Sequence, residues 1–122
     1  MVKERTDELL AVMSEQQRLS AELDLASDIQ NSMLPDVYPV FPDRKEFDIH
    51  TFIETAVEVG GDLFNYKMLD DDHLMMVIAD VCGKGIPAAL FMVKITTLIS
   101  AVSKDIKTAG EIASTVNNLI CE

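Results

Sequence analysis

The first third of the chain has the hydrophobic pattern of one long helix. Residues 2–33 contain neither glycine nor proline and are rich in residues that favour helices. Pro35 follows and is expected to end the helix. Apolar residues recur in alternating steps of three and four, as in a coiled-coil seam, and two glutamines share their stripe: Leu9, Val12, Gln16, Leu19, Leu23, Ala26, Gln30 and Met33. The stripe equally suits an amphipathic helix lying on its own domain, and both interpretations stay open.

Beyond Pro35 the pattern becomes that of extended segments. Prolines make residues 35–46 a rigid connector. Alternation of apolar and polar residues then predicts a first strand within "EFDIHTFIETA" and a second in "DLFNYKML". A turn at Asp70–Asp72 leads to a third strand, "HLMMVIAD". Because the third strand is apolar almost throughout, we expect it to be buried on both faces.

Two further helices are predicted. Pro87 fits the first turn of an apolar helix that continues to Lys104. Thr108 is a candidate N-cap of the last helix, with Glu111 completing a capping box. The fold class predicted from these elements is α+β, a partial β-sandwich flanked by helices and preceded by a long N-terminal helix. We divide the chain into the helix 1–34, the connector 35–46 and a domain segment 47–122.

Charge and cysteine content exclude several classes of protein. A net charge of −11 argues against binding to nucleic acid and against simple attraction to an anionic membrane. Two cysteines without a C-x-x-C pair form neither a disulfide framework nor a structural zinc site. No apolar run approaches the roughly 20 residues of a membrane span, and the N-terminus lacks a signal peptide. We therefore expect a cytoplasmic protein, tethered to the inner membrane only if an upstream segment provides an anchor.

Two aspartates at strand ends are the main candidates for chemistry. Asp62 follows Gly60-Gly61 and begins the second strand, whereas Asp80 ends the third. A hairpin places both at the same end, where carboxylates beside glycine-rich turns form half of a site for Mg²⁺ or Mn²⁺. Gly83 and Gly85 would let a backbone carbonyl near Asp80 approach as a further ligand. The alternative is purely structural, with Asp80 capping the next helix and Asp62 lying in a turn.

Other catalytic motifs are absent from the sequence. Gly83-Lys84-Gly85 is not a Walker A loop, because no Ser or Thr follows Lys84. Neither His50 nor His73 has a Ser or Cys partner with a recognisable local signature of a catalytic triad.

Two motifs carry a resemblance to a known family. "EVGGDLFNY" and "VIADVCGKGIPAALFM" resemble the first half of a SpoIIE-type bacterial serine/threonine phosphatase of the PPM (protein phosphatase 2C-like) superfamily. "ELDLASDIQNSMLP" resembles the helix and Leu-Pro exit before the catalytic sheet of that family, and "TAGEIASTVNNLICE" resembles a later helix. Ser is more usual than Cys82, and Phe is more usual than Leu63, but both positions tolerate variation.

The resemblance implies a role for each candidate residue. It implies that Asp80 bridges two Mn²⁺ or Mg²⁺ ions, that the Val81 backbone carbonyl is an extra ligand, and that Asp62 holds metal-bound waters. The implied reaction is removal of phosphate from a phosphorylated protein, suspected to be a STAS-type anti-sigma-factor antagonist. The family's remaining metal-binding aspartates lie on later strands. We therefore expect this chain to be the N-terminal half of the domain, inactive alone, and a homodimer through its N-terminal helix.

Two alternatives to the phosphatase fit parts of the sequence. A GGDEF-type cyclic-dinucleotide synthase would also carry Gly-Gly-Asp, but Glu is typical where Leu63 stands, and such an enzyme does not predict the second aspartate in "ADVCGKG". A non-catalytic, dimerising signalling module with an inactive domain stays open.

Overall fold

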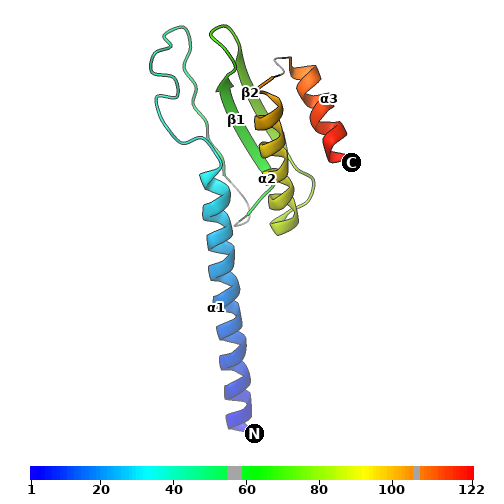
Figure 1. Cartoon of the computed structure of the whole chain (residues 1–122). Coiled ribbons are helices and arrows are strands. Elements are labelled where there is room, and N and C mark those ends of the chain that lie inside the picture. The colour runs from blue at the N-terminus through cyan, green and yellow to red at the C-terminus, as the bar shows by residue number, and fades with distance from the viewer. Residues whose placement is uncertain (55–58, 106–107) are drawn as a thin grey trace.

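The computed structural model describes residues 1–54, 59–105 and 108–122. The order of elements is α1 (Val2–Ser32), β1 (Asp62–Met68), β2 (Leu74–Asp80), α2 (Gly85–Val102) and α3 (Ala109–Ile120). Most of α1 projects away as a rod, while the hairpin, α2 and α3 gather near its C-terminal end (Figure 1). The α+β class and the predicted helices are confirmed, with ends that differ by a few residues. The described residues form one two-stranded sheet, so the second layer of a sandwich stays a prediction.

The core forms on one face of the β1–β2 hairpin. The strands pair antiparallel with Leu63 opposite Ala79, and alternate residues therefore share a face. Leu63 packs there with Met92 of α2 and with Leu34, which follows α1, and these three form the buried core cluster. Met92 has no exposed surface at all. Three segments that are far apart in the sequence thus meet in one small core.

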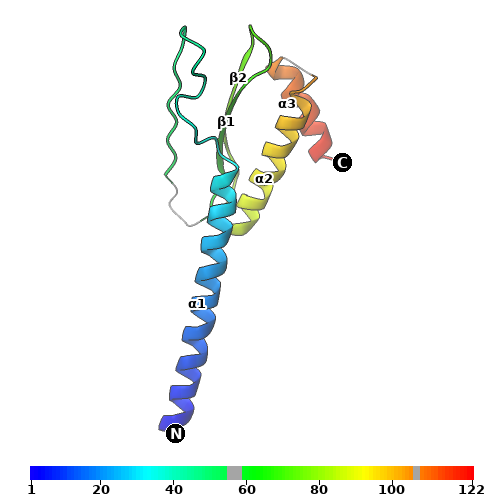
Figure 2. The same cartoon turned by 60° about the vertical axis from the view of Figure 1, so that its left-hand side comes forward.

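The other face of the hairpin is half-buried along β1 and exposed along β2. It carries Phe64 opposite Ile78 and Tyr66 opposite Met76. Ile78 is 90% exposed and Met76 is 70% exposed, because α2 and α3 both lie on the opposite side of the hairpin (Figure 2). The prediction that the third strand is buried on both faces is therefore wrong in this chain.

The predicted first strand does not form over its described residues, 47–54. Side chains there alternate between half-buried and exposed, as the pattern predicts, but the segment has no strand partner. The backbone N–H of Thr51 donates to the Tyr38 hydroxyl (3.0 Å), and that of Ile49 donates to the Asp48 carboxylate (2.9 Å). Since side chains occupy these backbone groups, the segment stays extended without a ladder. The rest of the pattern lies outside the described residues.

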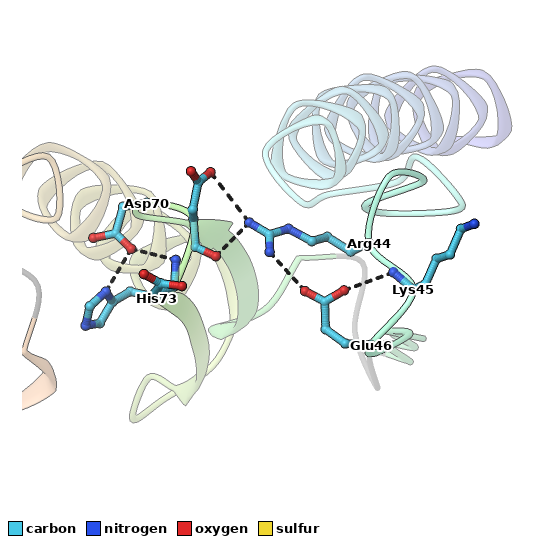
Figure 3. A network of polar contacts seen from close by, with 7 residues as sticks. Arg44, Lys45, Glu46, Asp70 and His73 are labelled. Carbon is cyan, nitrogen blue, oxygen red and sulfur yellow. Dashed lines mark hydrogen bonds and ion pairs between the residues drawn. The ribbon is translucent and has the colours of Figure 1, made fainter.

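Polar contacts attach the connector to the hairpin turn (Figure 3). Arg44 donates to the backbone carbonyl of Asp71 (2.8 Å) and to the Glu46 carboxylate (2.9 Å). Within the turn, the Nδ1 atom of His73 lies 2.8 Å from Asp70 Oδ1. The turn predicted at Asp70–Asp72 is confirmed. These contacts are exposed, so each contributes little to stability but helps to set where the connector lies.

The two C-terminal helices complete the described part of the chain. α3 packs through buried Ile112 and Val116, and Thr108 is its N-cap residue, as predicted. The Thr108 side chain makes no capping hydrogen bond, so the predicted capping box is wrong. α2 spans 18 residues with a mean hydropathy of 1.8, which by length and composition alone is enough to cross a membrane. The expectation that no apolar run approaches a membrane span is thus corrected, although core helices of soluble proteins pass the same test.

We expect Met92→Ala to lower the free energy of unfolding by about 3 kcal/mol, because it leaves a cavity where α2 meets the hairpin. Leu90→Ala, on the exposed side of the same helix, serves as the matched control and should change stability by less than about 0.5 kcal/mol. Urea unfolding followed by circular dichroism measures both. Equal effects of the two substitutions would contradict the assignment of the core.

Candidate metal centre

The hairpin register brings the two predicted aspartates together. Asp62 is the first residue of β1, Asp80 is the last of β2, and they are direct cross-strand partners. They lie on the face opposite the core, in line with Phe64 and Ile78, and both side chains are exposed. Directly opposed residues have Cβ atoms only about 5 Å apart. Two carboxylates are therefore held near each other at the open end of the sheet.

The electrostatics of Asp62 reflect this proximity. A hydrogen bond shared with the Asp80 side chain, followed by the negative charge of Asp80 and a small loss of hydration, raises the pKa of Asp62 above its ordinary 3.8. Like charges close together resist ionising at the same time. A bound cation would relieve this repulsion, so the pair is electrostatically suited to bind one.

A cleft of about 640 Å³ opens beside the pair. It lies between the extended segment and the open face of the hairpin, and its lining comprises residues 50–54, 62–64 and 78–80. Both aspartates therefore have solvent-accessible space in front of them, bounded by apolar side chains such as Phe64 and Ile78.

Gly61 sets the distance between the turn before β1 and the residue after β2. The N–H of Val81 donates to the Gly61 carbonyl at 3.1 Å. A Cβ atom on Gly61 would lie 2.8 Å from both the Cβ atom and the carbonyl oxygen of Val81, a distance that real contacts do not reach. Only glycine allows this approach.

The role expected for Gly83 and Gly85, which is to let a carbonyl near Asp80 approach a metal, stays a prediction. They have positive φ values of 95° and 75°, and an added Cβ would meet nothing within 4 Å. These glycines shape the turn between β2 and α2 through their backbone conformation. The glycine that permits close backbone approach is Gly61.

Sequence reasoning missed the role of Gln30. Its side chain is buried, and the backbone N–H of Gly60 donates to its Oε1 atom at 3.1 Å. Its Nε2 atom donates in turn to the Gly60 carbonyl. A glutamine within an apolar stripe was the available signal, but nothing in the sequence identifies Gly60 as its partner.

The stripe of α1 divides into two parts. Leu23, Ala26 and Gln30 are at least half-buried, so the C-terminal part lies on its own domain. Leu9 and Leu19, in the N-terminal part, are 63% and 54% exposed. The amphipathic-helix interpretation therefore holds near the domain, and the coiled-coil interpretation stays a prediction for the projecting part.

The donor set fits part of a hard-cation site. Outside residues 55–58 and 106–107, no group of three or more His, Cys, Asp or Glu side chains surrounds a common point. The available donors are the carboxylates of Asp62 and Asp80 and nearby backbone carbonyls, including that of Val81. Oxygen donors of this kind suit Mg²⁺ and Mn²⁺, which retain several waters.

Comparison with known proteins gives one family match. Residues 70–122, which include Asp80 and Val81, match the family described as Stage II sporulation protein E (SpoIIE). This segment, which is less than half of the chain, is similar to the SpoIIE family. The resemblance predicted from the sequence motifs is confirmed. Asp62 lies outside the matched residues but is the cross-strand partner of Asp80, which lies within them.

Three relatives of known name also resemble the chain. Protein IcfG of Synechocystis is 38% identical over 67% of this chain and 12% of its own length. Phosphoserine phosphatase RsbU of Bacillus subtilis is 34% identical over 63% of the chain and 22% of its own length. Phosphoserine phosphatase RsbP of the same organism is 32% identical over 63% of the chain and 18% of its own length. The chain thus spans less than a quarter of each relative. No solved structure matches it significantly.

We expect Gly61→Ala to destabilise the chain by about 1–3 kcal/mol, because the added methyl group overlaps Val81. Gly110→Ala is the matched control, since an added Cβ there meets nothing within 4 Å. In helix α3 it should stabilise the chain by up to about 1 kcal/mol. Thermal unfolding of both variants measures the difference, and a neutral Gly61→Ala would contradict the close approach.

We expect Asp80→Asn to lower the pKa of Asp62 toward its ordinary value, because the neighbouring charge is removed. In the wild-type chain the raised pKa means that Asp62 binds its proton more tightly in the folded state than in the unfolded state. This stabilises the folded state at pH values below the ordinary aspartate pKa, and the stabilisation is lost as the pH rises through the pKa of folded Asp62. Without metal, Asp80→Asn should therefore be the more stable form at neutral pH, and the difference should shrink in acid.

Carbon-13 NMR titration of the Asp62 carboxyl group, together with unfolding at acidic and neutral pH, measures both effects. Asp28→Asn, on the exposed surface of α1, is the control and should leave the titration of Asp62 unchanged. If Asp80→Asn leaves the pKa of Asp62 unchanged, the two carboxylates do not interact.

Proposed function

We propose that the protein containing this chain is a metal-dependent phosphatase that removes phosphate from phosphoserine or phosphothreonine in a protein. The observation that carries the proposal is the direct pairing of Asp62 with Asp80 at the edge of a SpoIIE-family segment. Two relatives named phosphoserine phosphatases support the reaction class. By family resemblance, the proposed substrate is a phosphorylated STAS-type anti-sigma-factor antagonist.

In this proposal Asp62, Asp80 and the Val81 carbonyl hold Mn²⁺ or Mg²⁺. When bound, the two ions of a complete site supply an activated water and neutralise charge on the phosphoryl oxygens. The chain's own residues supply fixed negative charge, to which Asp62 contributes as a carboxylate. Gly61 keeps the Val81 backbone close to the pair. The adjoining cleft gives a phosphorylated side chain a route to the aspartates.

The chain on its own is proposed to bind metal weakly and to be inactive. Two carboxylates and a carbonyl are too few ligands to fix two ions, because Mg²⁺ and Mn²⁺ give up their waters reluctantly. Ions that stay largely hydrated cannot hold a water in line with phosphorus. Further ligands from the rest of the domain would complete the site.

We expect Asp80→Asn in the complete natural protein to reduce Mn²⁺-dependent hydrolysis of a phosphoserine peptide by at least about 100-fold, because a neutral amide weakens cation binding. Asp28→Asn, far from the pair on α1, should retain wild-type turnover. Phosphate release at several Mn²⁺ concentrations measures both variants. Near wild-type turnover by Asp80→Asn would remove Asp80 from the site. Product analysis with GTP in the same preparation tests the cyclase alternative.

We propose that α1 also makes the protein a homodimer. The exposed part of its stripe, with Leu9, Val12 and Leu19, offers apolar side chains at coiled-coil spacing to a second copy. This surface is the observation that favours the alternative of a dimerising signalling module, and it is compatible with the phosphatase. A cytoplasmic location is proposed for the chain, with α2 packed on the hairpin through Ala88 and Met92.

We expect the chain to sediment as a dimer and the double variant Leu9→Glu/Leu19→Glu to sediment as a monomer, because charge at both positions opposes seam packing. Ser14→Glu, on the opposite side of the same helix, is the matched control and should stay dimeric. Analytical ultracentrifugation at several concentrations distinguishes the forms. A wild-type monomer throughout would contradict dimerisation through α1.

A further inference from the structure

Gln30 is the only buried residue of α1. A buried amide side chain requires hydrogen-bond partners, and Gln30 finds both on one distant residue. The Gly60 N–H donates to Gln30 Oε1, and Gln30 Nε2 donates to the Gly60 carbonyl. Because one side chain binds both backbone polar groups of Gly60, it restrains the orientation of that residue as well as its position.

Gly60 begins a short series of contacts that ends at the aspartate pair. The next residue, Gly61, accepts a hydrogen bond from the Val81 N–H. Asp62 follows and pairs with Asp80. No side chain at Gly60 or Gly61 can anchor this turn, so an anchor must come from elsewhere in the chain. The C-terminal end of α1 lies close to the start of β1 and can supply it (Figure 2).

Gln30 is well placed to serve as that anchor. Leu34, four residues further on and just beyond the end of α1, is buried in the core with Leu63 and Met92. The end of α1 is therefore fixed to the domain by an apolar contact, and Gln30 reaches the turn from this fixed base. Glycine-rich turns have many accessible conformations, and two hydrogen bonds from a fixed helix remove most of them.

We infer that Gln30 is a positioning residue for the proposed metal centre. It holds the Gly60-Gly61 turn so that Asp62 and the Val81 backbone stay in place beside Asp80. This inference rests on the proposed phosphatase function for its effect on metal binding, but the positioning itself is measurable without metal. Gln30 touches neither of the aspartates directly and acts through Gly60.

The test compares Gln30→Met with Gln17→Met in the complete natural protein. Methionine matches the length and flexibility of glutamine but cannot pair with Gly60. Gln17 lies on the same helix outside the apolar stripe, is exposed, and serves as the matched control. Amide hydrogen exchange resolved to single residues is measured at Gly60, which reports the direct contact, and at Val81, which reports the far side of the turn.

We expect Gln30→Met to speed exchange at both Gly60 and Val81 by about tenfold, because the Gly60 groups lose their partners and the turn opens more often. The Mn²⁺ concentration for half-maximal phosphopeptide hydrolysis should rise by about tenfold, with turnover at saturating Mn²⁺ preserved within about twofold. Gln17→Met should match the wild type in every measurement. If Gln30 serves only general packing, Gln30→Met should instead speed amide exchange at Gly60 alone or lower turnover at all Mn²⁺ concentrations.

A second variant, Gln30→Glu, provides an independent test if Gln30→Met does not fold. It keeps an acceptor for the Gly60 N–H but loses the amide donor, so protection at Gly60 should persist in part and the Mn²⁺ requirement should rise less than for Gln30→Met. Unchanged exchange at Val81 in Gln30→Met would overturn the inference, as would faster Val81 exchange with an unchanged Mn²⁺ requirement. If the wild-type protein shows no metal-dependent hydrolysis, the proposed function fails, and the metal-free Val81 exchange alone then decides whether Gln30 positions the turn.

Discussion

The antiparallel register of β1 and β2 is the constraint on which the rest of the structure depends. Pairing Leu63 with Ala79 directs these residues to the face that α2 covers. The same pairing places Asp62 opposite Asp80 on the other face. A slip of one residue would turn Leu63 toward water and separate the two carboxylates. Core packing therefore helps to maintain the site, because a one-residue slip would move the hydrophobic face into water.

Contacts from residues outside the strands hold both ends of the hairpin in place. At the turn, Arg44 connects the hairpin to the connector (Figure 3). At the aspartate end, Gly61 contacts Val81 on one side, and Gly60 binds Gln30 on the other. The two ends differ physically, since Arg44 makes exposed contacts that water can replace, whereas Gln30 is buried and its loss leaves backbone groups unpaired.

Two of the apolar surfaces that stay exposed in the described residues lie on the hairpin and on α1. One is the open face of the hairpin, where Ile78 is almost fully exposed, and the other is the projecting part of α1. Patches of this kind mark places where proteins make further contacts. The relatives IcfG and RsbU are several times longer than this chain, and the proposed dimer would cover the stripe on α1.

Local sequence signals determined most of the elements. The absence of Gly and Pro over α1, the Asp-rich turn and the early Pro87 each act within a few residues, so the helices and the hairpin could be predicted. Asp62 and Asp80 could be placed at one end because a hairpin requires it. Tertiary structure decided whatever depends on distant partners. Residues 47–54 have a strand pattern but form no ladder among the described residues, and two of their backbone N–H groups bind Tyr38 and Asp48 instead. Gln30 has the spacing of a seam residue, yet it is buried against Gly60, because hydrogen bonding across 30 residues leaves no periodic trace in the sequence.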